Sequence, residues 1–136
     1  MARQKNRSIL SKTQKKNLEN KIRKKTGLFI DPYFSATKIK WIINNVKKAK
    51  QLLKNKKLLF GTIDTFLIWK LTGGTVHATD ATNASRTMLY NINNNKWDKE
   101  ILKILKIPKN ILPEVKNTAD DYGFTNKSIV GESIPI

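Results

Sequence analysis

The sequence predicts a mixed α/β fold, and three observations support this class. Segments with apolar residues at three- and four-residue intervals, typical of amphipathic helices, alternate with short stretches rich in Thr, Val and Tyr that are typical of strands. The chain of 136 residues is long enough for one small domain. With 39% hydrophobic and 8% aromatic residues, it can also bury an apolar core.

The N-terminal region predicts a polar helix followed by a turn. Residues 11–25 place Leu18 and Ile22 on one face of a helix, and Gly27 is predicted to end it, because glycine readily adopts the left-handed conformation found after helices. A turn is predicted immediately before Pro32, since the residue that precedes a proline avoids the helical conformation.

A longer amphipathic helix is predicted from Ser35 onward, with a break near Lys47. Lysines occupy its solvated face. Its apolar positions are Ile39, Ile42, Ile43, Val46, Ala49, Leu52 and Leu53. After this helix, the apolar residues 58–60 predict a short buried strand.

The middle of the chain predicts one more helix and then two strands. Asp64 is predicted to cap a helix that extends to Leu71, and the glycines at 73–74 are predicted to end it. Residues 76–92 are richer in Thr, Val and Tyr, so they predict a strand, a turn and a second strand.

The C-terminal part predicts a single helix followed by loops. Asp98 is predicted to open this helix and Pro108 to stop it. Its inward-facing positions are Ile101, Leu102, Ile104 and Leu105. The glycines and prolines beyond it predict loops with one short strand.

Charge is distributed unevenly along the chain. The net charge is +17; residues 1–57 hold 18 basic and 2 acidic residues, whereas residues 58–136 hold 9 and 8. Such an excess raises nucleic acid as a partner. However, 23 of the 27 basic residues are lysine, and proteins that read phosphates and bases draw heavily on arginine. Because Lys, Ile and Asn share A/T-rich codons, we attribute the excess to genome composition, and nucleic acid is not the expected partner.

Composition excludes several kinds of site. The chain has no cysteine, so it has neither disulfides nor thiolate metal ligands. Its one histidine, His77, cannot form a histidine-based metal cluster, and we interpret it as structural. The apolar run at residues 66–69 is far shorter than a membrane span, and the basic N-terminus lacks the apolar stretch of a signal peptide. The sequence therefore predicts a cytoplasmic protein with no metal site and no membrane partner.

The remaining polar and aromatic candidates have structural interpretations, and no generic nucleotide-binding or metalloprotease motif is present. Asp31, Asp64 and Asp80 each lie beside a predicted turn or helix start, which favours a capping role. The tryptophans lie in or beside apolar helical faces, which favours core packing. They are Trp41, Trp69 and Trp97. These features alone predict an α/β protein without assigning a function.

Longer sequence motifs resemble those of a known protein family. Residues 26–45 read TGLFIDPYFSATKIKWIINN, with Tyr33, Ser35, Lys38 and Trp41 at the spacing of a family signature. The match continues through LLFGTIDT, LIWKLTGG, TNASRTML and LPEV further along the chain. In this order the strings closely resemble glycerol kinases of the FGGY carbohydrate kinase family. The resemblance is colinear from about Leu18 to Ile136.

This resemblance implies a fold, an activity and one site residue. The implied fold is an incomplete first domain, actin-like and ribonuclease-H-like, over residues 1–136, with residues 1–17 weakly matched and the second domain outside the chain. The complete enzyme would use ATP and Mg²⁺ to phosphorylate glycerol to sn-glycerol 3-phosphate, and a homo-oligomer is compatible with this. Tyr33 is the implied substrate-binding residue, because its counterpart contacts glycerol.

The resemblance also places parts of the active site outside the chain. The family's phosphate loop and Arg-Glu pair precede the aligned region, and its catalytic aspartate falls beyond Ile136, so no catalytic or cofactor-binding residue is assigned here. Arg86 receives no catalytic role. We therefore expect the chain to be inactive alone and, with sheet edges and apolar surface uncovered, to be marginally stable or to aggregate. Two alternatives stay open: a subunit that binds a partner fragment carrying the missing parts, and a basic module that binds nucleic acid.

Four positions depart from the family pattern. Ala36 stands where Gly is usual, Phe66 where Trp is common and Ala81 where an aromatic residue is usual. Ser133 stands where regulated bacterial members have an Arg that helps to bind fructose 1,6-bisphosphate. Without this guanidinium a bidentate phosphate contact is missing, so that regulation is not expected.

Overall fold

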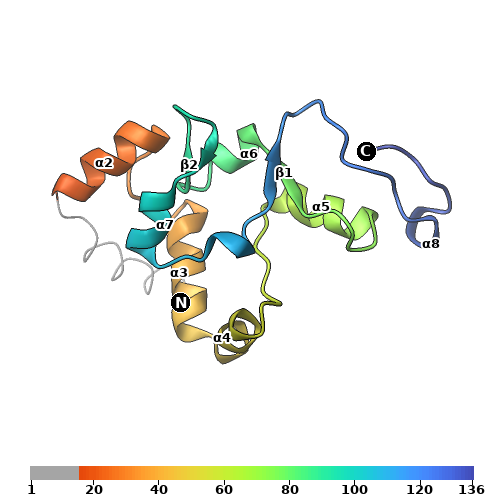
Figure 1. Ribbon diagram of the computed structural model, residues 1–136, viewed down its shortest axis with the longest axis horizontal. Coiled ribbons are helices and arrows are strands. Elements are labelled where there is room, and N and C mark those ends of the chain that lie inside the picture. Colours follow the sequence, from red (N-terminus) through yellow and green to blue (C-terminus); the bar gives the residue numbers. More distant parts are fainter. Residues whose placement is uncertain (1–15) are drawn as a thin grey trace. The chain divides into compact units, whose positions relative to one another are not determined.

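The computed structural model describes residues 16–136, which divide into two compact units (Figure 1). The described part of the first unit comprises residues 16–58 and 85–109, and the second comprises residues 59–84 and 110–136. Helices alternate with short strands in the described chain, so the predicted α/β class is confirmed.

Helices form most of the first unit. They are α2 (Lys16–Thr26), α3 (Ser35–Asn45), α4 (Lys47–Lys54) and α7 (Lys99–Leu105). Gly27 ends α2 with a φ of +73°, as predicted, while the predicted helical residues 11–15 lie outside the described part. The break in the second predicted helix is also confirmed. It falls at Val46, whose extended backbone separates α3 from α4.

A two-stranded antiparallel hairpin completes the first unit. Its strands are β2 (Tyr90–Asn91) and β3 (Lys96–Trp97), with Tyr90 opposite Trp97. Asn95 supplies a positive φ of 53° in the connecting turn, a conformation that asparagine tolerates. Asp98 then caps α7 as predicted, because its carboxylate accepts the backbone N–H groups of Glu100 and Ile101.

The core of the first unit gathers side chains from all these elements. Its buried apolar residues are Ile22, Ile30, Ala36, Ile39, Ile43, Ala49, Met88, Leu89, Tyr90, Trp97, Ile101, Leu102, Leu105 and Ile107. Ile42 was predicted to face inward but is 42% exposed. It lies beside the stripe formed by Ala36, Ile39 and Ile43, which are the apolar residues that α3 buries.

The second unit combines short helices with a parallel strand pair. Its elements are α5 (Ile63–Leu71), β1 (Ala78–Asp80), β4 (Glu114–Lys116) and α8 (Lys127–Val130). Ala78 of β1 pairs with Glu114 of β4. Two further short elements, α6 (Ala81–Ser85) and the 3₁₀ turn η1 (Lys109–Ile111), lie where the chain passes from one unit to the other. Gly73 and Gly74, both at positive φ, follow α5 as predicted.

Two strand predictions are wrong. Residues 58–60 form no strand, because the one backbone hydrogen bond recorded there, from the Phe60 N–H to the Ile111 carbonyl, reaches a 3₁₀ turn that cannot extend a ladder. Residues 76–92 contain α6 between their two strands rather than a turn. These strands also pair with β4 and β3 and not with each other.

Two helix starts also differ from prediction. Thr62, not Asp64, is the N-cap residue of α5, so Asp64 lies one residue inside the first turn. Helix α8 was expected to be loop. Asn126 initiates it, because its side chain accepts the Ser128 N–H at 2.9 Å. Such a cap stabilises a helix of only four residues, which is marginal by itself.

Candidate functional site around Tyr33

Tyr33 lies in the turn that leads into α3. The Asp31 carboxylate accepts the Tyr33 N–H at 2.7 Å, and the Asp31 carbonyl accepts the Phe34 N–H at 3.3 Å. This arrangement confirms the turn predicted at Pro32, whereas Asp31 holds the turn and does not cap α3, whose N-cap residue is Phe34. The turn fixes the backbone of Tyr33, whereas its side chain is 69% exposed.

Three side chains approach the Tyr33 ring. The Phe34 ring meets it edge to face, with centroids 5.3 Å apart and an interplanar angle of 87°. The Arg86 guanidinium lies 5.9 Å from the Tyr33 centroid and 5.2 Å from the Phe34 centroid. The Lys38 ammonium also lies 5.9 Å from the Tyr33 centroid and donates to the Tyr33 carbonyl at 2.8 Å. Two cations therefore lie within cation–π range of one exposed phenol.

Arg86 reaches this position because its segment is tied to the start of α3. The Ala36 N–H donates to the Thr87 carbonyl at 3.0 Å, and Thr87 is buried. Met88 is also buried and holds a positive φ of 65°, which turns the chain back into the core. Sequence reasoning did not foresee the contacts of Arg86 and Lys38 with Tyr33. Arg86 is remote in sequence, and no periodicity links it to an aromatic partner.

The arrangement around Tyr33 is suited to binding rather than to proton transfer. The phenol can donate and accept hydrogen bonds with a small hydroxylated ligand, and its ring offers apolar surface. A guanidinium and an ammonium can orient such a ligand, but neither is a carboxylate base that could accept its proton. The surroundings of Tyr33 therefore offer hydrogen-bonding groups, apolar ring surface and two cations to such a ligand.

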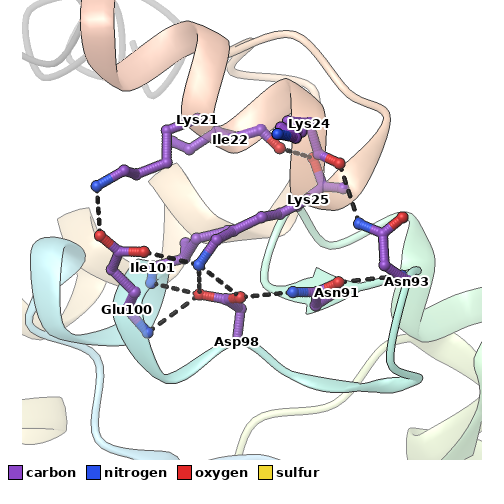
Figure 2. Close-up of polar contacts among 10 residues, drawn as sticks. Lys21, Ile22, Lys24, Lys25, Asn91, Asn93, Asp98, Glu100 and Ile101 are labelled. Carbon is purple, nitrogen blue, oxygen red and sulfur yellow. Dashed lines mark hydrogen bonds and ion pairs between the residues drawn. The ribbon is translucent and has the colours of Figure 1, made fainter.

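A second polar cluster of the first unit joins α2 to the β2–β3 hairpin and α7 (Figure 2). The Lys25 ammonium contacts both Asp98 oxygens at 3.0 and 3.1 Å and Glu100 at 2.7 Å, and the Asn91 amide donates to Asp98 at 2.8 Å. Burial alone would raise the pKa of Asp98. Hydrogen bonds from the Ile101 N–H, Asn91 and Lys25 outweigh it, so this pKa lies below its usual value. These groups satisfy one another, and the cluster is structural.

A third polar cluster surrounds Asp80 in the second unit. One carboxylate oxygen accepts the Asn83 N–H at 2.7 Å and the Asn83 amide at 2.9 Å, and the other accepts the Thr118 hydroxyl at 2.7 Å. Burial would raise the pKa of Asp80, but these donors outweigh it and hold the pKa below its usual value. The predicted capping role of Asp80 is confirmed at the start of α6.

The other candidates have structural contacts. Asp64 accepts the hydroxyls of Thr62 and Thr79, the latter at 2.6 Å, which ties α5 to β1. His77 places Nε2 2.7 Å from the Phe60 carbonyl, in agreement with its structural interpretation. Among the tryptophans, Trp97 is buried as predicted, whereas Trp41 and Trp69 are half-buried.

Residues 16–136 contain neither a candidate metal cluster nor a candidate membrane span. No group of three or more His, Asp or Glu side chains in this range could hold a metal ion. None of the helices in this range is both long and apolar enough to cross a membrane.

Comparison with known proteins decides the family. The model of the N-terminal domain of the FGGY family of carbohydrate kinases matches residues 2–135. The chain belongs to this family. This FGGY chain is 57% identical over 128 residues to the glycerol kinase of Chelativorans sp. (strain BNC1), which covers 94% of the chain and 26% of that relative. It is 56% identical over 128 residues to the glycerol kinase of Caldanaerobacter subterraneus subsp. tengcongensis, with the same coverage.

Solved structures agree with the family. The FGGY chain superposes on a crystal structure of Plasmodium falciparum glycerol kinase with ADP at a TM-score of 0.89 and 37% identity, covering 96% of this chain and 26% of that one. For gluconate kinase from Lactobacillus acidophilus the TM-score is 0.77 at 27% identity, with 93% and 24% covered. The predicted kinase fold is confirmed. The chain spans about a quarter of the length of the relatives it matches.

Proposed function

We propose that this FGGY chain is the N-terminal part of a glycerol kinase, which transfers the γ-phosphoryl group of ATP to a terminal hydroxyl of glycerol and yields sn-glycerol 3-phosphate. The observation that carries the proposal is that the chain has higher sequence identity to glycerol kinases than to a related sugar-acid kinase. Identity is 57% with a bacterial glycerol kinase and 37% with the Plasmodium falciparum enzyme, against 27% with a gluconate kinase.

In this proposal, residues 16–136 contribute the wall of the polyol site that contains Tyr33. The exposed phenol binds a glycerol hydroxyl, and the neighbouring cations favour its oxygen atoms. Phosphoryl transfer further needs a carboxylate to accept the hydroxyl proton, and Mg²⁺ with backbone donors to hold the phosphates. We assign no residue of this range to those tasks, which belong to regions of the kinase fold outside it. The proposal places the enzyme in the cytoplasm and is compatible with a homo-oligomer.

A chimeric enzyme tests the substrate. Residues 2–135 replace the matching quarter of the Chelativorans glycerol kinase, and glycerol-dependent ADP release is measured. We expect phosphorylation of glycerol, with Tyr33→Phe raising the KM for glycerol about three- to tenfold and leaving the KM for ATP unchanged, because one hydrogen bond to the polyol is lost. Phe29→Leu, at a 56% exposed ring of the same unit, is the control and should change neither constant.

Phosphorylation of gluconate or xylulose in preference to glycerol would contradict the proposal, and so would a Tyr33→Phe variant with unchanged kinetics. A second experiment uses the 136-residue chain alone with Mg-ATP and glycerol. We expect no ATP consumption above a blank, and recovery of activity when the remaining three quarters of the Chelativorans enzyme are co-expressed. Glycerol-dependent turnover by the chain alone would show that it carries the catalytic groups itself.

A further inference from the structure

The backbone of Tyr33 is fixed, but packing does not fix its ring. The Asp31 carboxylate holds the N–H of Tyr33 at 2.7 Å, and the Lys38 ammonium holds its carbonyl at 2.8 Å. The ring itself is 69% exposed, so its side-chain torsions would sample several rotamers unless specific contacts restrained them. A substrate-binding phenol in several rotamers would lose affinity through the entropy of ordering it.

Arg86 supplies such a restraint. Its guanidinium lies within cation–π range of both adjacent rings, 5.2 Å from the Phe34 centroid and 5.9 Å from the Tyr33 centroid. The two rings are nearly perpendicular and lie edge to face, and the Arg86 guanidinium lies near both of them. Within residues 16–136, the Arg86 guanidinium forms no ion pair. It contacts the rings of Tyr33 and Phe34.

The segment that carries Arg86 is rigid enough to act as a support. The hydrogen bond from the Ala36 N–H to the Thr87 carbonyl joins it to the first turn of α3, and Thr87 and Met88 are both buried. Arg86 itself is exposed at the end of this anchored segment. A positioning side chain requires an anchored backbone and an exposed group that reaches its target, and Arg86 has both.

We propose that Arg86 is a positioning residue that holds the Tyr33 ring in the orientation in which it binds the polyol. The consequence for glycerol affinity rests on the proposed function, whereas the restraint on the ring does not. Arg86 acts through Tyr33 and needs no contact with glycerol.

The restraint is tested by NMR spectroscopy on the isotopically labelled 136-residue chain. In Arg86→Ala, we expect the Hα–Hβ couplings of Tyr33 to move from values of one dominant χ1 rotamer towards averaged values. In Tyr33→Ala, the δ-methylene protons of Arg86 should lose part of their upfield ring-current shift. Arg23→Ala is the matched control, since the Arg23 guanidinium lies 4.5 Å from the Phe29 centroid in the same unit; it should leave the Tyr33 couplings unchanged.

A kinetic cycle in the chimeric kinase tests the consequence for binding. Arg86→Ala should raise the KM for glycerol about two- to fivefold, the range expected for an exposed cation–π contact, with a smaller change in kcat. In the Tyr33→Ala background the same substitution should have no further effect, because its target is gone. A purely structural role of Arg86 would instead give additive effects.

The outcomes separate this inference from the proposed function. Unchanged Tyr33 couplings in Arg86→Ala, or additive effects of the two substitutions on KM, overturn the positioning role even if the chimera phosphorylates glycerol. If Tyr33→Ala leaves the KM for glycerol unchanged while the couplings respond to Arg86→Ala, the restraint stands and the proposed role of Tyr33 fails.

Discussion

The two units of the chain differ in where they place their apolar side chains. The first unit buries a continuous set from α2, α3, the hairpin and α7 around Ile22, Ile39 and Ile101. In the second unit, fewer apolar residues among those described are buried: Ala78, Ala84, Ile111, Leu112 and Tyr122. Many of its large apolar side chains are exposed, namely Leu59, Ile63, Phe66, Leu67, Phe124, Ile129, Val130 and Ile134.

The polar interior differs in the same way. The buried acid of the first unit, Asp98, pairs with Lys25, whereas the buried acid of the second unit, Asp80, accepts hydrogen bonds from neutral donors. Helix α5 is apolar on nearly all sides, which is typical of a helix from the interior of a larger protein. The comparison shows that the first unit buries a larger apolar core, while the second unit buries fewer apolar side chains and leaves more of its large ones exposed.

The largest expected effect comes from the core of the first unit. Ile101→Ala removes a side chain with 0% exposure and should lower the free energy of unfolding by about 2–5 kcal/mol, measured by urea denaturation. Ile42→Ala, on the outer side of α3, is the control and should change it by less than about 0.5 kcal/mol. Equal losses of unfolding free energy for the two substitutions would contradict the assignment of Ile101 to the core and of Ile42 to the surface.

The two buried acids should differ in their contributions. Asp98→Ala removes a helix cap and leaves Lys25 without its buried partner, so we expect a loss of about 2–3 kcal/mol. Asp80→Ala removes the cap of α6 and the hydrogen bond from Thr118 but breaks no ion pair, and should cost about 1–2 kcal/mol. Thermal denaturation of both variants checks this order, and a larger loss for Asp80→Ala would reverse the comparison.

A close contact in the second unit provides a third test. Gly73 has a φ of +67°, and a Cβ there would lie 2.5 Å from the Asn126 amide nitrogen. Gly131 has a φ of +88° but nothing within 4 Å of such a Cβ. Gly73→Ala should therefore cost about 2–3 kcal/mol and Gly131→Ala about 1 kcal/mol, the strain of the backbone alone. Similar losses would mean that α5 and the Asn126 loop are not packed together.

Acid should destabilise both units through their buried carboxylates. The folded-state pKa values of Asp98 and Asp80 lie below the ordinary value of 3.8, so as pH falls the unfolded chain binds protons first. Stability is therefore full above about pH 5 and declines as the pH drops through 3.8 towards the folded values. Asp98→Asn and Asp80→Asn should each flatten this decline, as measured by unfolding between pH 2 and about 6; an unchanged slope in both would contradict it.

The smallest effect on stability is expected at the exposed face of α5. Phe66→Gln should change the free energy of unfolding by less than about 0.5 kcal/mol, because the ring is 51% exposed. It should nevertheless reduce self-association in sedimentation experiments, since apolar surface is removed. Phe29→Gln, at an exposed ring of the first unit, should not. A matching effect at Phe29 would show that the exposed apolar side chains of the first unit promote self-association as well.

Local chemistry allowed much of the fold to be predicted. Gly27, the break near Val46 and the Asp98 cap follow from backbone conformations that single residues favour, so the sequence around them is sufficient. The failures lie where a distant segment decides. Residues 58–60 look like a strand but find one carbonyl of a 3₁₀ turn to pair with, and the first strand of the region 76–92 pairs with the distant β4 instead of with β2.

The candidate site divides along the same line. Tyr33 was selected as a candidate from a motif that lies within a short stretch of sequence. Its contact with Arg86 could not be predicted, because it depends on the hydrogen bond from the Ala36 N–H to the Thr87 carbonyl at the start of α3. By itself, the sequence determined the family and the local features at Gly27, Val46 and Asp98, and its family resemblance led to the proposal that Tyr33 binds substrate. Tertiary structure decided which strands pair, which apolar faces are buried and which cations approach the Tyr33 ring, because these depend on contacts between residues that no local pattern relates.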